Sequence, residues 1–493
     1  MAFRLKPIEH IPFLYLGGFS FLVFSLQLIQ GTSLSFATHI CLFNIFVILS
    51  FNLVGGLTSI AGWLILLFSL RHVIISQLTK ILMWQAADSG LLSPNISSLV
   101  YSVGALALLG ATFLVSALNN KGHQGMKLST RYYSPKISWG LFICGWVCIV
   151  AVNYQNDLPF ILRPLINLMS YLQPLILCGL GYEVSQTLSK TEGRDLFNRS
   201  AIVMFLICFA RGVLVAAKQY MFEPLLVIMV SAVFYQYQLK IKQLVITTFA
   251  LLLMAFVLTP LSDHGRTGFR KNNLSDTISS FGEYIITHFT SIEKFRNYSE
   301  EIEAEAYLGR KKERFYFGKK INLIDRFSLI HDADELISAY EYREGEGGQF
   351  FLKNLYLLPR SLTGKWIDLE ENTGDYLAHV AGVIPEENIG TAVSFGFFAE
   401  AFAIGKWWGL FFIPFVALFS YLFFLKKLQG RDYGLGWPVF MVLYLEHLFS
   451  EAGVVNLLMM IVRIFPLLLI LGKIVHLFEE AISNKNGQVK NEI

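Results

Sequence analysis

Arginine side chains recur at positions from which they could bind a phosphate group. Arg326 and Arg360 lie in the only long polar segment of the chain, and Arg163 and Arg211 lie near the ends of apolar segments. A guanidinium group is always charged, and its planar fork of N–H donors matches phosphate oxygens. Two or three such side chains could hold a diphosphate and stabilise it as it leaves. For Arg326 and Arg360 the alternative is a structural salt bridge, because acidic neighbours are plentiful.

Glu400 and His379 are the residues best suited to proton transfer. Glu400 lies where the polar segment leads into an apolar one, so it could orient a hydroxyl group or act as its base. His379 follows Asp375 by four residues, and the two side chains would share a face if this stretch is helical. A histidine in a polar loop is more often simply solvated, which leaves Glu400 as the first candidate.

Several ionisable residues lie inside or beside apolar segments, where a charge within a membrane is costly and tends to mark function. They are Arg163, Arg211, Glu446, His447, Glu451 and Arg463. With Glu400, they are predicted to lie toward the outer side of the membrane, as a polar cavity that opens outward would require. The alternative is that each snorkels to the headgroups or pairs with another.

The composition indicates a membrane protein. Of the 493 residues, 54% are hydrophobic and only 15% are charged. Such a chain is too apolar for an ordinary soluble protein and too long to form a single transmembrane span. The fold class that we expect is therefore an all-α polytopic membrane protein. The five cysteines all lie in apolar runs, so we predict neither a disulfide framework nor a zinc site.

The charge is divided unevenly along the chain. Residues 261–390 contain 16 Lys and Arg against 22 Asp and Glu, a net charge of −6, so the remainder carries +10. The basic residues of that remainder are spread over short loops and do not form one continuous face. We therefore expect no binding to nucleic acid.

About 20 apolar residues cross a hydrocarbon core of about 30 Å, and a window of that length predicts twelve transmembrane helices. The predicted spans are 11–30, 35–53, 58–79, 97–118, 137–155, 160–187, 197–217, 221–238, 243–260, 403–425, 436–453 and 456–478. The third is the least regular, because Arg71, His72 and Lys80 interrupt it. The first is long enough to span and lacks a small-residue cleavage site, so we expect it to be retained.

Lys and Arg concentrate at alternate ends of these spans, with Lys218 at an opposite end as the exception. They are Arg4, Lys6, Lys121, Lys127, Arg131, Lys136, Lys190, Arg194, Arg199, Lys240, Lys242, Lys426, Lys427, Arg431, Lys485 and Lys490. Because basic loops stay in the cytoplasm, both termini are predicted to be cytoplasmic. The expected organisation is a bundle of about nine helices (1–260), a large extracytoplasmic loop (261–402), about three more helices (403–478) and a cytoplasmic tail (479–493).

The large loop is expected to be mostly helical. Apolar residues recur at three- and four-residue spacing over 277–296, which predicts an amphipathic helix that lies on the membrane or on the tops of the spans. The charged run 298–320 is most simply a solvated helix or linker, although its stretch Arg310 to Arg314 could contact an anionic headgroup. This loop would lie away from ATP and nucleotide sugars, so any substrate there must already be activated.

Three motifs follow one another at the end of this loop. They are Arg326-Phe-Ser-Leu, then Pro359-Arg360 followed by Lys365, then Phe398-Ala-Glu400 leading to Gly405. Their order resembles that of the bacterial O-antigen polymerase (Wzy-type) and oligosaccharide repeat-unit polymerase families. The resemblance covers about 80 residues and the general topology. Ala399 stands where those families have Gly, and Trp366 follows Lys365 where they have Pro.

The resemblance implies a GT-C-like polymerase or ligase architecture and a metal-independent glycosyltransferase. Such an enzyme moves a growing glycan from undecaprenyl diphosphate onto a lipid-linked repeat unit on the periplasmic side of the inner membrane. Glu400, Arg360, Arg326 and His379 would then be catalytic. The further substrate-binding residues would be Arg211, Arg163, Lys365, Arg314 and Arg463. Membrane lipid, a chain-length regulator and a flippase are the other implied partners.

Two other functions remain open at the level of the sequence. An O-antigen ligase would use a similar fold and donor but would transfer finished chains to lipid A core. A transporter or lipid-linked-glycan flippase would make no bond, and the internal repeat that many transporters show is not evident here.

Overall fold

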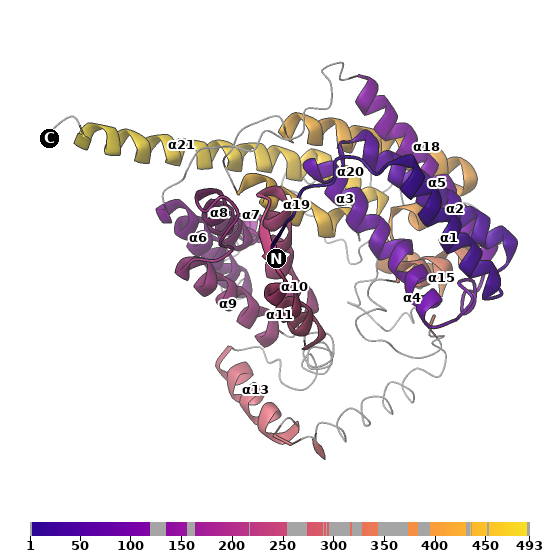
Figure 1. Ribbon diagram of the computed structural model, residues 1–493, viewed down its shortest axis with the longest axis horizontal. Helices are drawn as coiled ribbons and strands as arrows, with labels where there is room; N and C mark the ends of the chain where they lie inside the picture. Colours follow the sequence, from indigo (N-terminus) through magenta and orange to yellow (C-terminus); the bar gives the residue numbers. More distant parts are fainter. Residues whose placement is uncertain are drawn as a thin grey trace.

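In a computed structural model of the chain, the described residues are almost entirely α-helical (Figure 1). The description covers residues 2–118, 135–154, 163–215, 217–253, 274–288, 290–291, 293–294, 316–317, 328–343, 373–382, 395–429, 434, 436–450 and 453–490.

The helices follow one another along the chain with few other elements. The first part forms α1 (Phe13–Ile29), α2 (Leu34–Leu53), the 3₁₀ turn η1 (Gly56–Thr58), α3 (Ile60–Ser69), the π-helical turn η2 (Leu70–Ile74), α4 (Ile75–Leu82), α5 (Pro94–Ala117), α6 (Pro135–Asn153), α7 (Arg163–Leu172), α8 (Leu175–Lys190), α9 (Arg199–Leu214), α10 (Lys218–Phe234) and α11 (Ile241–Leu253). The second part forms α13 (Leu274–His288), α15 (Leu329–Glu341), α17 (Thr373–Ala381), α18 (Phe397–Gln429), α19 (Trp437–Ser450), α20 (Val454–Met459), the π-helical turn η7 (Met460–Ile464) and α21 (Phe465–Lys490). Two short strands, β1 (Ala2–Arg4) and β2 (Gln238–Lys240), pair antiparallel.

Six of the described helices are long and apolar enough to cross a membrane. They are Leu34–Leu53, Ile60–Leu82, Pro94–Ala117, Lys136–Asn153, Phe397–Gln429 and Met460–Leu477. The predominantly α-helical character is thus confirmed, and six helices have the length and composition expected of membrane spans. The predicted first, seventh, eighth and eleventh spans are also helical, but their 17, 16, 17 and 14 residues fall short of the usual length of about 20. The twelve-span topology and the GT-C-like architecture stay predictions.

The predicted sixth span, 160–187, is two helices and not one. α7 ends at Leu172 and α8 begins at Leu175, with Pro174 at the N-cap of α8. Proline lacks a backbone N–H and its ring clashes with the preceding turn, so it ends one helix and is tolerated where the next begins. The apolar run continues through this break, which is why hydropathy alone did not reveal it.

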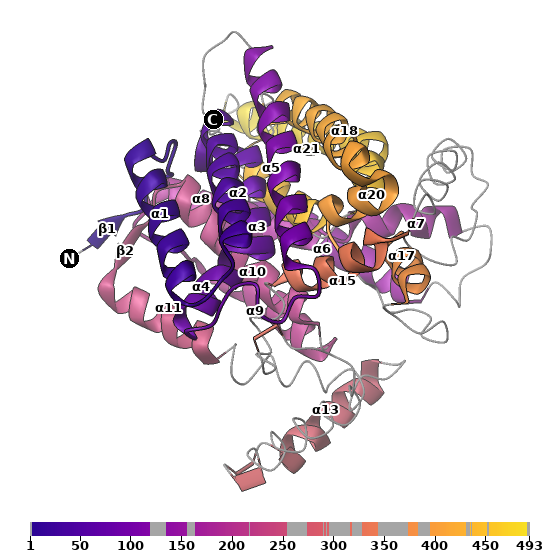
Figure 2. The same ribbon diagram turned by 90° about the vertical axis from the view of Figure 1, so that its right-hand side faces the viewer.

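The predicted amphipathic helix over 277–296 corresponds to α13. It begins three residues earlier, at Leu274, and ends at His288. α13 contacts α9 and lies at the edge of the molecule in both views (Figure 2). A helix is therefore present over most of the predicted range, and residues 293–294 are again helical. That this segment lies on the membrane or on the tops of the spans stays a prediction.

Four loops that were predicted to be cytoplasmic meet at one end of the bundle. In the β1–β2 pair, Arg4 lies opposite Gln238. The Gln238 N–H donates to the Gly193 carbonyl oxygen at 2.8 Å, and the Leu57 N–H donates to the Ile8 carbonyl oxygen at 2.8 Å. The segment before α1 and the connections α2–α3, α8–α9 and α10–α11 therefore share one end, as the alternation of basic residues predicts. We call it the basic end; the side of the membrane that it faces stays a prediction.

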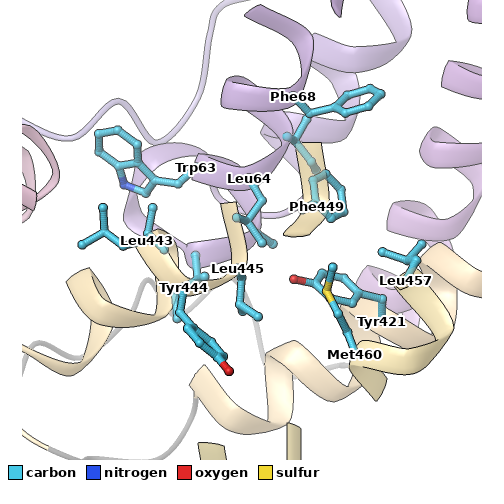
Figure 3. Close-up of a cluster of buried hydrophobic side chains, with 14 of the residues drawn as sticks. Trp63, Leu64, Phe68, Tyr421, Leu443, Tyr444, Leu445, Phe449, Leu457 and Met460 are labelled. Atoms are coloured by element: carbon cyan, nitrogen blue, oxygen red, sulfur yellow. The ribbon is translucent and has the colours of Figure 1, made fainter. Parts of the chain in front are cut away.

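One part of the core is a cluster of large apolar side chains from α3, α18, α19 and α20 (Figure 3). The Phe68 ring lies 4.7 Å from that of Phe397 and 5.8 Å from that of Phe449, measured between centroids. Tyr421 contacts the same Phe449 ring at 5.4 Å. Segments from the first and last quarters of the chain therefore pack as one unit.

α18 is not one straight helix. Gly405 has φ −142° and ψ 21°, and Lys406 has φ 52° and ψ −143°, so the helix breaks there. A Cβ placed on Gly409 would lie 2.9 Å from the Ala401 carbonyl oxygen. Residues eight apart in a straight helix are separated by about 12 Å, so the two pieces fold back on each other. We call residues 397–404 the short arm and residues 407–429 the long arm.

The short arm reaches deep into the bundle. A Cβ on Gly104 would overlap the Phe398 ring, and Gly104 lies ten residues after the start of α5, about 15 Å along its axis. At the other end of the short arm, Lys406 donates to backbone oxygens at the C-terminus of α15, among them that of Glu341. The Glu341 carboxylate in turn accepts from the Ser93 hydroxyl at the start of α5, at 2.9 Å. The short arm therefore runs from inside the bundle back to the end where α15 lies, and the long arm then runs through the bundle from that end.

This geometry corrects two predictions. The predicted tenth span began at residue 403 and placed Glu400 before it, whereas α18 begins at Phe397 and Glu400 lies within the short arm. Residues 397–403 of the short arm are all buried by protein, whereas the non-helical Gly405 and Lys406 are only partly buried, at the end of the bundle where Lys406 contacts α15.

Candidate functional site

α15 attaches the long polar segment to the end of the bundle opposite the basic end. Its Asp334 is fully buried and caps α5: the Leu92 and Ser93 N–H groups and the Ser97 hydroxyl all donate to the carboxylate, the last at 2.6 Å. The first amides of a helix have no partner within it, so a carboxylate there is stabilising. Burial raises the pKa of Asp334, while the three hydrogen bonds oppose the rise.

Tyr316 provides a second attachment of the same segment. Its hydroxyl donates to the Ala87 carbonyl oxygen at 2.6 Å. The Lys80 ammonium group lies 4.3 Å from the centroid of its ring and donates to the Ser89 carbonyl and hydroxyl oxygens at 2.9 and 2.8 Å. Lys80 is therefore a buried cation whose contacts with Ser89 and with the Tyr316 ring hold the loop between α4 and α5 against the polar segment.

Glu400 caps the start of α20. Its side chain is buried, and its Oε2 accepts from the Val454 N–H at 3.1 Å. A Cβ on Gly453 would overlap this carboxylate, so only glycine leaves room for it. The Gly453 carbonyl oxygen accepts from the Leu457 N–H at 3.0 Å, which makes Gly453 the N-cap residue. The carboxylate therefore joins the short arm to the last membrane helix, and its role as a base stays a prediction.

His72 lies beside the deep end of the short arm. Its Nδ1 is 2.9 Å from the Tyr101 hydroxyl, and its ring stacks on Phe68 at a centroid distance of 4.2 Å. A Cβ on Gly396, which has φ 77°, would overlap the imidazole. The short arm thus begins against a buried histidine on the π-helical turn η2.

Arg71, next to His72 on η2, forms an ion pair with Glu446 of α19. Arg71 Nη1 and Glu446 Oε1 are 3.1 Å apart, and the two side chains are 15% and 14% exposed. Arg71 is near the middle of the Ile60–Leu82 helix, where a charge in a membrane is most costly. π-helical turns inside α-helices occur frequently at functional sites. This pair is the clearest sign of function that the described residues offer.

Two further ionisable residues, Arg211 and Glu223, are linked to this pair. Arg211 of α9 lies with its guanidinium carbon 4.2 Å from the centroid of the Tyr220 ring. Glu223 of α10 interacts electrostatically with both Arg211 and Glu446. We call Arg71, Glu446, Glu223 and Arg211 the charged row; it brings together two cations and two carboxylates from four segments.

The other residues predicted from the sequence are placed as follows. Arg326, Arg360, Lys365 and Arg314 lie outside the described residues. Arg163 is the first residue of α7, and Arg463 lies in η7. α17 contains both Asp375 and His379, so the helix that this predicted pair requires is present. His379 is partly buried near the end of this helix. Of the predicted site residues that the structure describes, Arg211 belongs to the charged row, and Glu400 occupies a separate position.

Arg71 and Lys406 were missed as site residues. Arg71 was treated as an irregularity of the third span, although an arginine inside a 23-residue apolar helix is itself a functional signal. Lys406 follows a glycine in an apolar run, and its left-handed backbone gave no signal in the sequence.

Comparison with known proteins gave no relative. No protein-family model matches the chain, and no curated protein or solved structure matches it. Any function must therefore be argued from the residues and their arrangement.

Proposed function

We propose that the protein is a glycosyltransferase of the bacterial inner membrane that polymerises lipid-linked repeat units. It would transfer a growing glycan from undecaprenyl diphosphate onto the next lipid-linked unit. The observation that carries the proposal is the docking of α15 and Tyr316 on the end of the bundle opposite the basic end. If basic loops face the cytoplasm, the long polar segment and its arginines lie outside, where only pre-activated, lipid-tethered sugars are available.

The chemistry requires little from the protein beyond binding and charge stabilisation. The bond that breaks joins the anomeric carbon of the donor sugar to a phosphate oxygen, and the bond that forms joins that carbon to an acceptor hydroxyl oxygen. The hydroxyl proton must be removed, and the departing diphosphate gains negative charge. Arg326 and Arg360 are proposed to stabilise that charge. Glu400 is proposed as the base; its Oε2 keeps the capping contact with the Val454 N–H, which leaves Oε1 to accept the proton once the acceptor hydroxyl reaches this buried side chain.

Purified protein incubated with lipid-linked repeat units tests the proposal. The wild type should produce a ladder of longer glycans, and Arg360→Ala should leave single units on the carrier. Arg343→Ala is the matched control, because Arg343 lies in the same segment and donates to the Val380 carbonyl oxygen of α17. A wild type that leaves glycan length unchanged would exclude a polymerase, and a normal ladder from Arg360→Ala would exclude Arg360 from the chemistry.

A transporter of lipid-linked glycans is the second candidate, and the break in α18 favours it. Discontinuous helices that end within the bundle build the substrate sites of many secondary transporters. The short arm, with its N-terminal end beside His72, has this form. The same incubation separates the two functions, because a transporter moves the glycan across a vesicle membrane without lengthening it.

A further inference from the structure

The antiparallel pair of β1 and β2 turns one face toward the bundle. Successive residues of a strand point to opposite faces, and directly opposite residues share a face. The pairing extends beyond Arg4, because the Leu5 N–H donates to the Tyr237 carbonyl oxygen at 2.9 Å. Tyr237 is buried, and Leu5 and Leu239 pack against the hydrophobic core. The other face of this small sheet is therefore turned away from the bundle.

The face that is turned away is basic. Arg4 and Lys240 both belong to it, because Lys240 lies opposite Ala2, two residues before Arg4. Their Cβ atoms are therefore diagonal neighbours, about 7 Å apart. Lys6 follows Arg4 by two residues along the extended chain, about 7 Å further on. All three side chains are exposed, and we call Arg4, Lys6 and Lys240 the outward cations.

No carboxylate neutralises the outward cations in the part of the chain that the structure describes. The adjoining segments carry Glu9, Glu192 and Asp195, and none of them forms an ion pair with these cations there. The Glu192 carbonyl oxygen accepts from the Gln238 side chain at 3.4 Å, but the Glu192 carboxylate lies 3.9 Å from Arg194. Like charges on neighbouring strands destabilise their pairing. An anion from outside the chain would therefore stabilise the closed sheet.

The outward cations lie where the exposed apolar surface of the helices begins. β2 leads directly into α11, whose Ile241, Leu244 and Val245 side chains are each half exposed or more. β1 leads within a few residues into α1, where Leu14 is 83% exposed. Exposed apolar side chains of a membrane bundle lie against acyl chains, and the phosphate groups of the lipids lie just beyond them. The outward cations are thus at the depth of the headgroups.

We propose that the outward cations bind the headgroup of an acidic phospholipid, and that this lipid holds β1 and β2 together. The headgroup phosphate supplies the missing counter-charge, and the fork of the Arg4 guanidinium matches its oxygens. The acyl chains of the same lipid lie along the exposed apolar side chains of α1 and α11. Anionic lipids attract basic segments at the membrane surface in this way. This site is separate from the proposed glycan chemistry and does not depend on it.

Hydrogen exchange of the Leu5 amide reports closure of the sheet, because this N–H bonds across it. The purified full-length protein is placed in lipid nanodiscs of phosphatidylcholine, which has no net headgroup charge, or of phosphatidylglycerol, which is acidic. Each Lys or Arg near an anionic surface strengthens the attraction by roughly fivefold, and the open strands keep part of that attraction. We therefore expect Leu5 to exchange about tenfold more slowly in phosphatidylglycerol. The Gly193 amide, which donates to the Leu188 carbonyl oxygen at 2.8 Å, is the internal reference and should exchange equally in both lipids.

Three variants assign the effect to this face. Arg4→Gln with Lys240→Gln removes the repulsion and the attraction together, so the sheet should close more readily than in the wild type in phosphatidylcholine and should no longer respond to phosphatidylglycerol. Arg4→Lys with Lys240→Arg keeps both charges and should respond as the wild type does. Lys426→Gln with Lys427→Gln is the matched control, because it removes two exposed cations of α18, and it should also respond as the wild type does.

Slower exchange of Leu5 that requires both the acidic lipid and the outward cations would support the proposal. Equal exchange in the two lipids would overturn it, as would a response that survives in Arg4→Gln with Lys240→Gln or disappears in Lys426→Gln with Lys427→Gln. Glycerol phosphate added to phosphatidylcholine nanodiscs tests an anion in solution; protection equal to that in phosphatidylglycerol would overturn the assignment to a lipid.

Native mass spectrometry in detergent gives a second readout that measures binding directly. Phosphatidylglycerol should bind to Arg4→Gln with Lys240→Gln roughly 30-fold more weakly than to the wild type, at about fivefold for each cation. Equal binding to the two proteins would overturn the site.

Discussion

Replacing Asp334 by alanine should release α15 from the bundle. The substitution leaves three donors without their acceptor: the part-buried Leu92 and Ser93 N–H groups and the buried Ser97 hydroxyl. Hydrogen bonds to a charged acceptor contribute about 1.5–3 kcal/mol each, and the cost of burying the carboxylate offsets a large part of the total. A net loss of about 3 kcal/mol is expected, which raises the population of undocked α15 by roughly 100-fold.

Hydrogen exchange of the backbone amides of α15 measures this population directly. Asp88→Ala is the matched control, because Asp88 also caps a membrane helix, accepting from the Ser33 N–H at the start of α2 at 2.8 Å. It is only partly buried, so its loss should cost about 1 kcal/mol or less and leave α15 protected. Exchange in Asp334→Ala that stays within a few-fold of the wild type would refute the docking role of this carboxylate.

The pH dependence of the same exchange follows from the pKa of Asp334. Burial raises that pKa above the ordinary value, so the docked state favours the protonated carboxyl. Protonation therefore adds to the stability of the docked state. This added stability is complete below the pKa of a free aspartate, about 3.9, and is lost as the pH rises through the raised value, above which the hydrogen bonds to the ionised carboxylate remain. Exchange of α15, corrected for its intrinsic rate, should slow on acidification. Asp334→Asn should remove this change while leaving any effect of the nearby His331–Glu335 pair, whose atoms are 3.9 Å apart.

Three further predictions concern the short arm and the attachment of the polar segment. Gly453→Ala should destabilise the protein by about 1–3 kcal/mol, because its Cβ overlaps the Glu400 carboxylate; the thermal midpoint should recover in part when Glu400→Ala is added. In a background without native cysteines, Ala401→Cys and Gly409→Cys should form a disulfide on mild oxidation, and failure to cross-link would indicate a straight α18. Tyr316→Phe removes one buried hydrogen bond and should cost about 1 kcal/mol, seen as several-fold faster proteolysis near residue 316, whereas unchanged proteolysis would show that the hydroxyl is dispensable.

The positions of the regular helices were largely predictable from the sequence. The second span was predicted at 35–53 and is Leu34–Leu53, and the fourth was predicted at 97–118 and is Pro94–Ala117. Long apolar runs have one stable solution in a membrane, because a helix satisfies its own backbone hydrogen bonds. The grouping of the basic loops at one end was also predictable, because successive spans run in opposite directions and alternate loops therefore lie at the same end of the bundle.

The folding back of α18 and the partners of the charged residues were not predictable in this way. The break at Gly405 and Lys406 lies inside a continuous apolar run, and the short arm is fixed by contacts with α5 and α20 far away in the sequence. Arg71 and Glu446 are separated by 375 residues, so no local pattern could pair them. Glu400 was singled out by its position, but its burial against Gly453 depends on the tertiary packing of α20.

The pairing of β1 with β2 has a consequence for how the chain is made. Arg4 cannot find its partner until Gln238 has been synthesised, which takes roughly 10 to 50 s at ordinary translation rates. During that time the first helices must enter the bilayer with the leading residues unpaired. This small two-stranded sheet can therefore close only about halfway through synthesis, after α1 to α10 have been made.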